Sequence, residues 1–220
     1  MENFPALSAL MDQYSSFTFG TANRFGVSRY QLNRAIDQGI LDKSETGIYV
    51  KAGYFEDEMS IISQRFSRGI FDRESALIYY DLSDEMPFRY TMTFPRGYHP
   101  TAQSLKKHFI KKAQYRTGRY YSAEITTQLT DFGNKIQIYS LERSLLDAWN
   151  SETTQLYTKN DAVKRYAERP DGDYNKLLKL ERELYPRSTL SKILEVLVQW
   201  KTIPNCQIKC NSEDSSMWIG

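Results

Sequence analysis

The segment FGVSRYQLNRAIDQG, residues 25–39, carries side chains suited to reading nucleic acid. At the helical spacing of about 100° per residue, Leu32 and Ile36 fall on one side, whereas Tyr30 and Arg34 fall on the other. Arg can donate two hydrogen bonds to guanine, and Asn or Gln can bond twice to adenine. The expected DNA-binding residues of this helix are Ser28, Arg29, Tyr30, Gln31, Asn33 and Arg34. The alternative is a solvated helix face in a module that binds protein.

Local signals define the elements that position this helix. Ser28 is placed to cap its N-terminus, and Gly39 ends it in the left-handed conformation that glycine tolerates. Residues 5–14 predict an earlier helix, and TANRF predicts a second one with Thr21 as its N-cap. The segment ILDKSETGIYVKA then indicates a strand, a turn and another strand. Three helices followed by a hairpin predict a winged helix-turn-helix over residues 1–52.

The hairpin, or wing, supplies side chains for contact with the DNA backbone. Its expected phosphate-binding residues are Lys43, Ser44, Thr46 and Lys51. Such contacts position a module without reading sequence. Residues 1–52 hold five basic and five acidic side chains, so their net charge is zero. This balance is a weak signal for a nucleic-acid binder, which usually carries a basic surface.

Positive charge gathers later, in residues 96–123, which contain no acid. The cations there are Arg96, Lys106, Lys107, Lys111, Lys112, Arg116 and Arg119. Tyrosines interleave with them, as they do in surfaces that meet nucleic acid or acidic protein. Three interpretations stay open: a solvated face, phosphate contacts beside the winged helix, and a surface for a protein partner.

The pattern changes after residue 52. Residues 53–68 predict a linker with one connecting helix, and residues 69–200 alternate strands and helices before a helical run. This order predicts an α+β domain, and an α+β fold class for the chain as a whole. Residues 201–220 are polar without a period, and we expect a flexible tail. Cys206 and Cys210 lie in it, and we expect incidental thiols there.

The sequence offers little for catalysis. No Asp or Glu is followed two residues later by Lys, as a restriction-endonuclease-like site would normally show, and neither Cys/His clusters nor glycine-rich phosphate loops occur. His99 and His108 have no acid near them in sequence, which argues against a catalytic triad. In LERSLLDAW, the spacing of Arg143 and Asp147 favours a structural ion pair. We therefore expect no enzyme, no metal site and no cofactor.

The cellular location follows from what the chain lacks. The N-terminus has neither the basic start nor the unbroken apolar run of a signal peptide. No apolar run reaches the ~18 residues of a membrane span. These features predict a soluble, cytoplasmic protein without membrane contact.

Three segments match the order of a known family. GVSRYQLNRAIDQGILDKSETGIYV is similar to its helix, wing and GxY strand, and FDRESALIYYDLSDEMPFRYTMTFPRG is similar to its strand, ESAL helix and following strand. IQIYSLERSLLDAW is similar to the segment before its C-terminal helices. On these motifs, which span roughly residues 5–200, the chain resembles the AbiEi family of antitoxins from bacterial type IV (abortive-infection, phage-resistance) toxin–antitoxin systems.

The resemblance implies a protein with two functions. The winged helix would bind double-stranded DNA at inverted repeats in its own promoter and repress the operon. The C-terminal domain would neutralise a nucleotidyltransferase-like toxin, without a stable complex being assured. The family usually has a His-Gly pair where this chain has Tyr80 and Asp81, so no role of that pair carries over. The alternative is a one-component transcription regulator whose second domain senses a ligand or dimerises.

Overall fold

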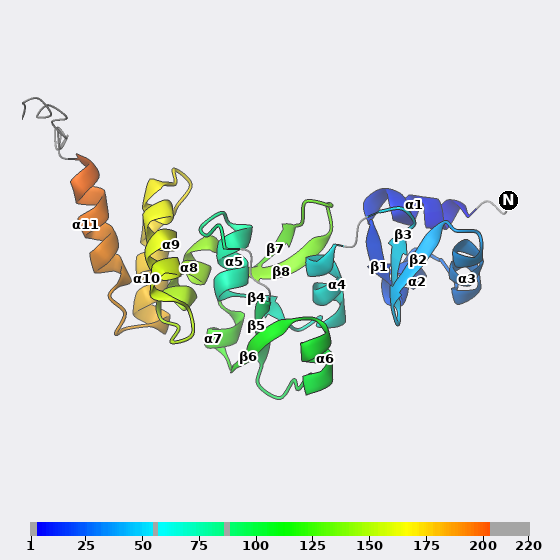
Figure 1. Cartoon of the computed structure of the whole chain (residues 1–220), viewed down its shortest axis with the longest axis horizontal. Coiled ribbons are helices and arrows are strands. Elements are labelled where there is room, and N and C mark those ends of the chain that lie inside the picture. The colour runs from blue at the N-terminus through cyan, green and yellow to red at the C-terminus, as the bar shows by residue number, and fades with distance from the viewer. Residues whose placement is uncertain (1–3, 55–56, 86–88, 203–220) are drawn as a thin grey trace, which may run out of the picture.

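The computed structural model describes residues 4–54, 57–85 and 89–202, without the side chains of residues 112 and 198–202. The molecule is elongated, with three parts in a row (Figure 1). A small N-terminal unit of helices and a sheet lies at one end. A larger sheet with flanking helices forms the middle, and the last helices of the chain form the other end. We call residues 57–202 the second unit.

The N-terminal unit packs three helices against a small sheet. Its elements are α1 (Pro5–Gln13), β1 (Ser16–Thr18), α2 (Phe19–Arg24), α3 (Arg29–Asp37), β2 (Leu41–Glu45) and β3 (Ile48–Lys51). The strands pair antiparallel in the order β1-β3-β2. Their apolar side chains share one core with those of the helices, in which Leu10 and Leu32 are fully buried. The expected helices and hairpin are therefore present, and β1 is an additional strand that the sequence pattern did not predict.

Two local expectations about helix ends have different outcomes. Thr18, not Thr21, caps α2, because the Thr18 side chain accepts a hydrogen bond from the Thr21 N–H at 3.1 Å. The capping of α3 by Ser28 is confirmed. Gly39 follows α3 with φ of 68°, in the left-handed region where glycine is tolerated best. α3 therefore has the start and the stop that its sequence predicts.

The second unit is built on a mixed five-stranded sheet. Its first elements are α4 (Glu58–Arg65), β4 (Ile70–Phe71), α5 (Arg73–Tyr79), β5 (Tyr90–Pro95), α6 (Ala102–Lys107), β6 (Ile110–Arg116), α7 (Arg119–Ser122), β7 (Ile125–Leu129) and β8 (Lys135–Tyr139). The strand order is β6-β5-β4-β8-β7, and the pairs β5–β6 and β4–β8 are parallel. The hairpin β7–β8 matches the sequence expectation. The basic stretch, for which no elements were predicted, forms α6, β6 and α7.

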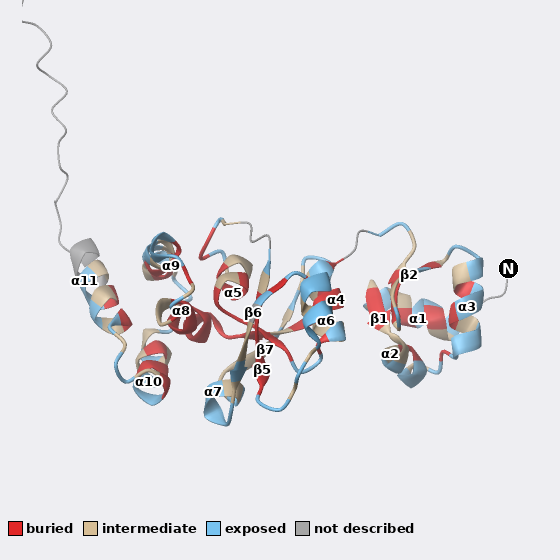
Figure 2. Cartoon of the chain, turned by 60° about the horizontal axis from the view of Figure 1, so that its bottom comes forward, coloured by how far each residue is buried: buried red, intermediate tan, exposed pale blue. Residues whose placement is uncertain are grey.

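Four helices complete the second unit: α8 (Leu141–Trp149), α9 (Leu156–Glu168), α10 (Tyr174–Leu184) and α11 (Leu190–Thr202). α8 packs against α5, α9 and α10, and it is buried along almost its whole length (Figure 2). Leu145 and Leu146 of α8 pack in one core with Leu177 of α10 and Leu194 of α11. The mixed α+β fold class is confirmed.

The predicted tail begins too early, because α11 continues to Thr202. The remainder of the tail, with Cys206 and Cys210, lies outside the described residues. In the part of the chain that the structure describes, no helix combines the length and apolar character needed to cross a membrane.

Candidate nucleic-acid interface

The outer face of α3 is open to solvent at one end of the molecule (Figures 1 and 2). Arg29, Asn33 and Arg34 are exposed, and Tyr30 has 64% of its surface accessible. Leu32 and Ala35 on the inner face are fully buried, so the helix cannot rotate without exposing apolar surface. The predicted division of α3 into a core face and an outer face is therefore present.

Ser28 and Gln31 are engaged in fixing the start of α3. The Ser28 Oγ accepts from the Gln31 N–H at 3.3 Å, while the Gln31 Oε1 accepts from the Ser28 N–H at 2.8 Å. This reciprocal capping box satisfies two backbone donors that helix ends leave open. The guanidinium of Arg29 lies 4.5 Å from the centre of the Phe19 ring, a cation–π contact with α2. The first turn is thus held in place, and its exposed side chains project from a fixed backbone.

The wing residues differ in how far they are free to reach a partner. Lys43 and Thr46 are exposed. Lys51 is half-buried, and its ammonium donates to the Tyr54 hydroxyl at 3.4 Å and lies 4.8 Å from the Tyr54 ring centre. The side chains of Lys43 and Thr46 are therefore accessible, whereas Lys51 is engaged with Tyr54.

The wing is also tied to the second unit through Glu45. Its carboxylate forms an ion pair with Lys107 at 2.7 Å and lies 2.9 Å from the His108 Nε2. The other ring nitrogen of His108 lies 2.7 Å from the Ser104 carbonyl oxygen, so a doubly protonated ring can donate on both sides. Burial alone would raise the pKa of Glu45, but the hydrogen bonds from Lys107 and His108 outweigh it and lower the pKa.

A second junction lies beside β1. The Asn134 side-chain amide donates to the Ser15 hydroxyl and to Asp57, each at 2.7 Å, and its carbonyl accepts from the Ser15 N–H at 3.2 Å. The Ser60 hydroxyl of α4 lies 2.9 Å from that of Ser16. The connecting helix α4 therefore contacts both the N-terminal unit and the rest of the second unit, and the linker expected over residues 53–68 contains a partly buried helix.

The structure does not bring the seven basic residues together as one free surface. Arg116 forms an ion pair with Asp147, and only 16% of its side chain is exposed, so little of it is open to a partner. Lys107 is paired with Glu45, and Arg119 with Glu183 at 2.5 Å. Arg96, Lys106 and Lys111 are exposed, and the side chain of Lys112 lies outside the described residues. Arg116 is therefore not part of an exposed basic surface, while the role of the other six cations stays a prediction.

A buried charge cluster surrounds Asp147. Its Oδ1 accepts from Arg143 of the same helix at 2.9 Å, from Arg116 at 3.0 Å and from the Tyr185 hydroxyl at 2.5 Å. The predicted structural pair of Arg143 and Asp147 is confirmed. Burial disfavours the charge of Arg116, but Asp147 and Tyr185 outweigh that effect and raise its pKa. The cluster ties β6, α8 and the end of α10 together, a connection invisible in the sequence because Arg116 lies in a basic run.

Comparison with known proteins bears on the fold. Among solved structures, the chain is similar to the RV2827C protein from Mycobacterium tuberculosis, with a TM-score of 0.51 and 12% identity over 88% of this chain and 74% of that chain. At this identity the similarity supports a shared fold and nothing finer. No family model matches the chain, and no curated protein matches its sequence. Within the described residues, no group of three or more His, Cys, Asp or Glu side chains could hold a metal ion.

Proposed function

We propose that the N-terminal unit is a winged helix-turn-helix that binds double-stranded DNA, and that the protein is an antitoxin of the AbiEi type. One observation carries the DNA-binding part. The capped helix α3 presents Arg29, Tyr30, Asn33 and Arg34 on its exposed face, beside the antiparallel sheet β1-β3-β2. A recognition helix enters the major groove in this way, with its first turns against the base edges.

The division of labour follows from side-chain chemistry. Arg29, Asn33 and Arg34 have the donors and acceptors that distinguish base pairs. Lys43 and Thr46 would bind phosphates and set the register. Because Glu45 is paired with Lys107 and His108, one of the five acids of the N-terminal unit is neutralised by the second unit. With the charge of Glu45 matched in this way, the other charged side chains of residues 1–52 are five basic and four acidic.

The second unit would supply the antitoxin function without catalysis of its own. The resemblance to AbiEi implies that it neutralises a nucleotidyltransferase-like toxin encoded beside it. The contacts around Asp147 support a scaffold role for the LERSLLDAW helix, since Arg143 and Asp147 are buried and bonded to each other, and Asp147 also accepts from Arg116 and Tyr185. Arg96, Lys106 and Lys111 are exposed, and we assign them to contact with either the toxin or DNA.

The DNA-binding proposal is tested by selecting duplexes from a random library with the full chain. Competition binding with mutated half-sites then follows. Asn33→Ala and Arg34→Ala should each weaken binding by ~1–3 kcal/mol and relax base preference. Asn160→Ala, an exposed residue of α9, is the matched control and should change neither. Unchanged affinity and preference in both α3 variants would remove the recognition-helix assignment.

The antitoxin proposal is tested by co-expression with an adjacent nucleotidyltransferase-like gene. The full chain should restore growth, and the α3 variants should still do so because neutralisation is assigned to the second unit. Failure to restore growth, with DNA binding intact, would favour the other candidate, a one-component transcription regulator. The apolar pocket at the far end of the second unit is the observation that supports this second candidate.

A further inference from the structure

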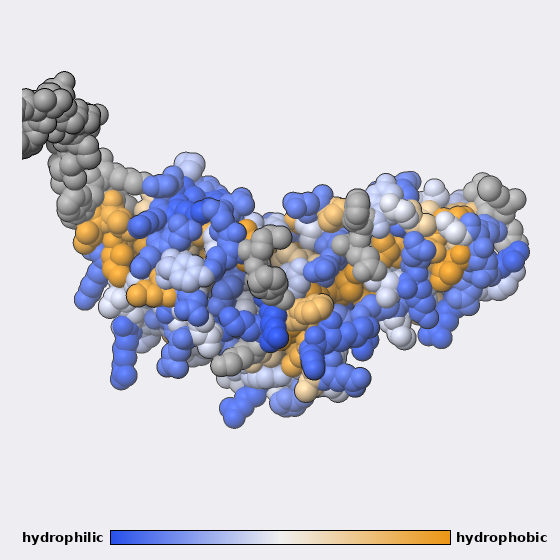
Figure 3. All heavy atoms as spheres, in the orientation of Figure 1, coloured by the Kyte–Doolittle hydropathy of each residue, from blue (hydrophilic) through white to orange (hydrophobic). Residues whose placement is uncertain are grey.

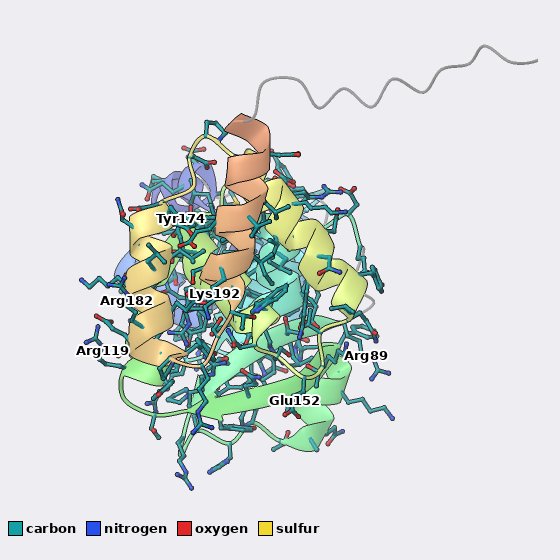
Figure 4. All side chains as sticks on the ribbon, turned by 90° about the vertical axis from the view of Figure 1, so that its left-hand side faces the viewer. Arg89, Arg119, Glu152, Tyr174, Arg182 and Lys192 are labelled. Carbon is teal, nitrogen blue, oxygen red and sulfur yellow. The ribbon has the colours of Figure 1, made fainter. Side chains whose placement is uncertain are left out.

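Residues of α9, α10 and α11 line a pocket. These helices lie at the end of the molecule opposite α3 (Figure 1). Figure 4 looks at this end, where α11 lies across the gap between the other two helices. Tyr174 stands near the start of α10, and Lys192 projects from α11. The pocket has a volume of about 430 Å³. Its described lining consists of Tyr166, Ala167, Arg169, Gly172, Tyr174, Leu194 and Glu195.

The walls of the pocket are mostly apolar. Leu194 and the Tyr166 ring come from the helical core, and Figure 3 shows apolar atoms gathered over α11. Gly172 lets the backbone approach Tyr166, since a Cβ there would lie 3.1 Å from the Tyr166 Cζ. Ligand pockets in proteins typically measure about 300–1,000 Å³ and have apolar walls with a few polar groups. The size and lining therefore suit a small, largely apolar molecule.

The charges around the pocket favour one sign of ligand. Arg169 lines it, but its Nε and Nη2 donate to Asp171 at 2.8 Å each, and its Nη1 donates to the Tyr80 carbonyl at 2.5 Å. The positive charge of Arg169 is therefore balanced by the carboxylate of Asp171. Glu195 adds a negative charge to the same lining. With Arg169 bonded to Asp171, the other charge of the described lining is that of Glu195, which would attract a cation rather than an anion.

The two tyrosines add a preference of the same sign. The face of a phenol ring attracts cations, and Tyr166 and Tyr174 both line the pocket. Burial and then Glu195 raise the pKa of Tyr174, and burial and then Glu142 and Asp173 raise that of Tyr166, so both phenols stay neutral. The buried Tyr166 hydroxyl has no hydrogen-bond partner among the described residues. Such an unsatisfied group in a pocket wall is unusual and calls for an explanation.

We propose that this pocket binds a small apolar molecule that carries one positive charge, of the arylalkylamine class. The inference stands apart from DNA binding, because the pocket and α3 are at opposite ends of the chain. A ligand there would touch α9 and α11 together and hold α11 in place.

Three probes of similar shape and different charge test the proposal on the full chain by isothermal titration calorimetry. They are phenethylamine, phenethyl alcohol and phenylacetate. We expect the amine to bind more tightly than the alcohol, and the alcohol more tightly than the acid. Binding of phenylacetate as tight as that of the amine would overturn the assignment of charge. No binding of any probe would overturn the site.

Two variants locate the binding. Ala167→Leu places a larger side chain in the pocket and should abolish binding of the amine and the alcohol. Glu195→Gln should weaken the amine by about threefold and leave the alcohol unchanged, because only the charge is removed. Glu152→Gln is the matched control, an exposed carboxylate outside the pocket lining that Figure 4 shows well away from Tyr174. A loss equal to that of Glu195→Gln in this control would overturn the assignment to the pocket.

Discussion

The two units of this protein place their charged side chains in opposite ways. Across residues 4–54, no charged side chain is buried, and the core is made of apolar groups packed between helices and sheet. In the second unit, Asp72, Arg73, Arg143 and Asp147 have almost no exposure to solvent. Buried ions are costly unless they are bonded to one another, so those of the second unit hold its elements in one arrangement. Exposed ions contribute little to stability and are available to a partner.

The largest expected effect comes from breaking the buried cluster. Asp147→Ala would leave the buried Arg143 and the largely covered Arg116 without their shared acceptor, and should lower the free energy of unfolding by ~4 kcal/mol. Urea denaturation followed by circular dichroism measures the change. Arg119→Gln breaks the exposed pair with Glu183 and should cost under about 0.5 kcal/mol. Similar losses in both variants would contradict the contrast between buried and exposed ions.

A smaller effect is expected at the contact between the wing and the second unit, which Glu45 forms with Lys107 and His108. Glu45→Ala removes the acceptor for Lys107 and for His108, whose side chain is only 6% exposed. It should lower the free energy of unfolding by ~2 kcal/mol at neutral pH. Asp42→Ala, on the same strand and exposed, is the control. If hydrogen exchange in β2 and β3 is faster in Glu45→Ala but not in Asp42→Ala, the loss of stability is located in the wing.

The pH dependence of that junction sharpens the test. The pKa of Glu45 is lowered from its ordinary value of 4.5, so the folded state favours the charged carboxylate. The stability it contributes is complete above about pH 4.5 and is lost as the pH falls through the folded pKa. The difference in melting temperature between the wild type and Glu45→Ala should therefore shrink as the pH falls further below 4.5. A constant difference from neutral pH downward would show that the carboxylate charge does not support the junction.

The sequence predicted the features that depend on residues close together in the chain, and it missed those that depend on distant segments. The helix from Arg29 and its Ser28 cap follow from neighbouring residues, and so does the pair of Arg143 and Asp147 one helical turn apart. β1 was missed because a three-residue strand carries no period and depends on β3 for its partner. β6 was missed because lysines interrupt its alternation.

The candidate interface was only partly predictable for the same reason. The exposed face of α3 follows from its helical period, since its apolar stripe must face the core. The fate of each cation in residues 96–123 depends instead on segments far away in the sequence. Arg116 meets Asp147, and Lys107 meets Glu45. A count of charges along the chain cannot distinguish such residues from free ones.

The smallest expected effect concerns the remaining exposed lysines. Lys106 lies on the same helix as Lys107, and Lys111 lies on β6, an edge strand of the sheet. If both bind DNA phosphates, the double variant Lys106→Gln/Lys111→Gln should reduce the magnitude of the log K against log salt slope by up to ~1.8, about 0.9 for each phosphate that the protein no longer neutralises. Base preference should not change, because phosphate contacts carry no sequence information.

Fluorescence anisotropy at four or more salt concentrations measures the slope, starting from a duplex selected by the full chain. Lys164→Gln/Lys179→Gln, exposed on α9 and α10, removes the same charge far from α3 and should leave the slope unchanged. If the Lys106/Lys111 variant also leaves it unchanged, these lysines do not touch DNA. Charged side chains on an edge strand keep it from pairing with other chains, and Lys111 would then have that role. Only a change confined to the first variant would extend the DNA interface from the N-terminal unit onto the second.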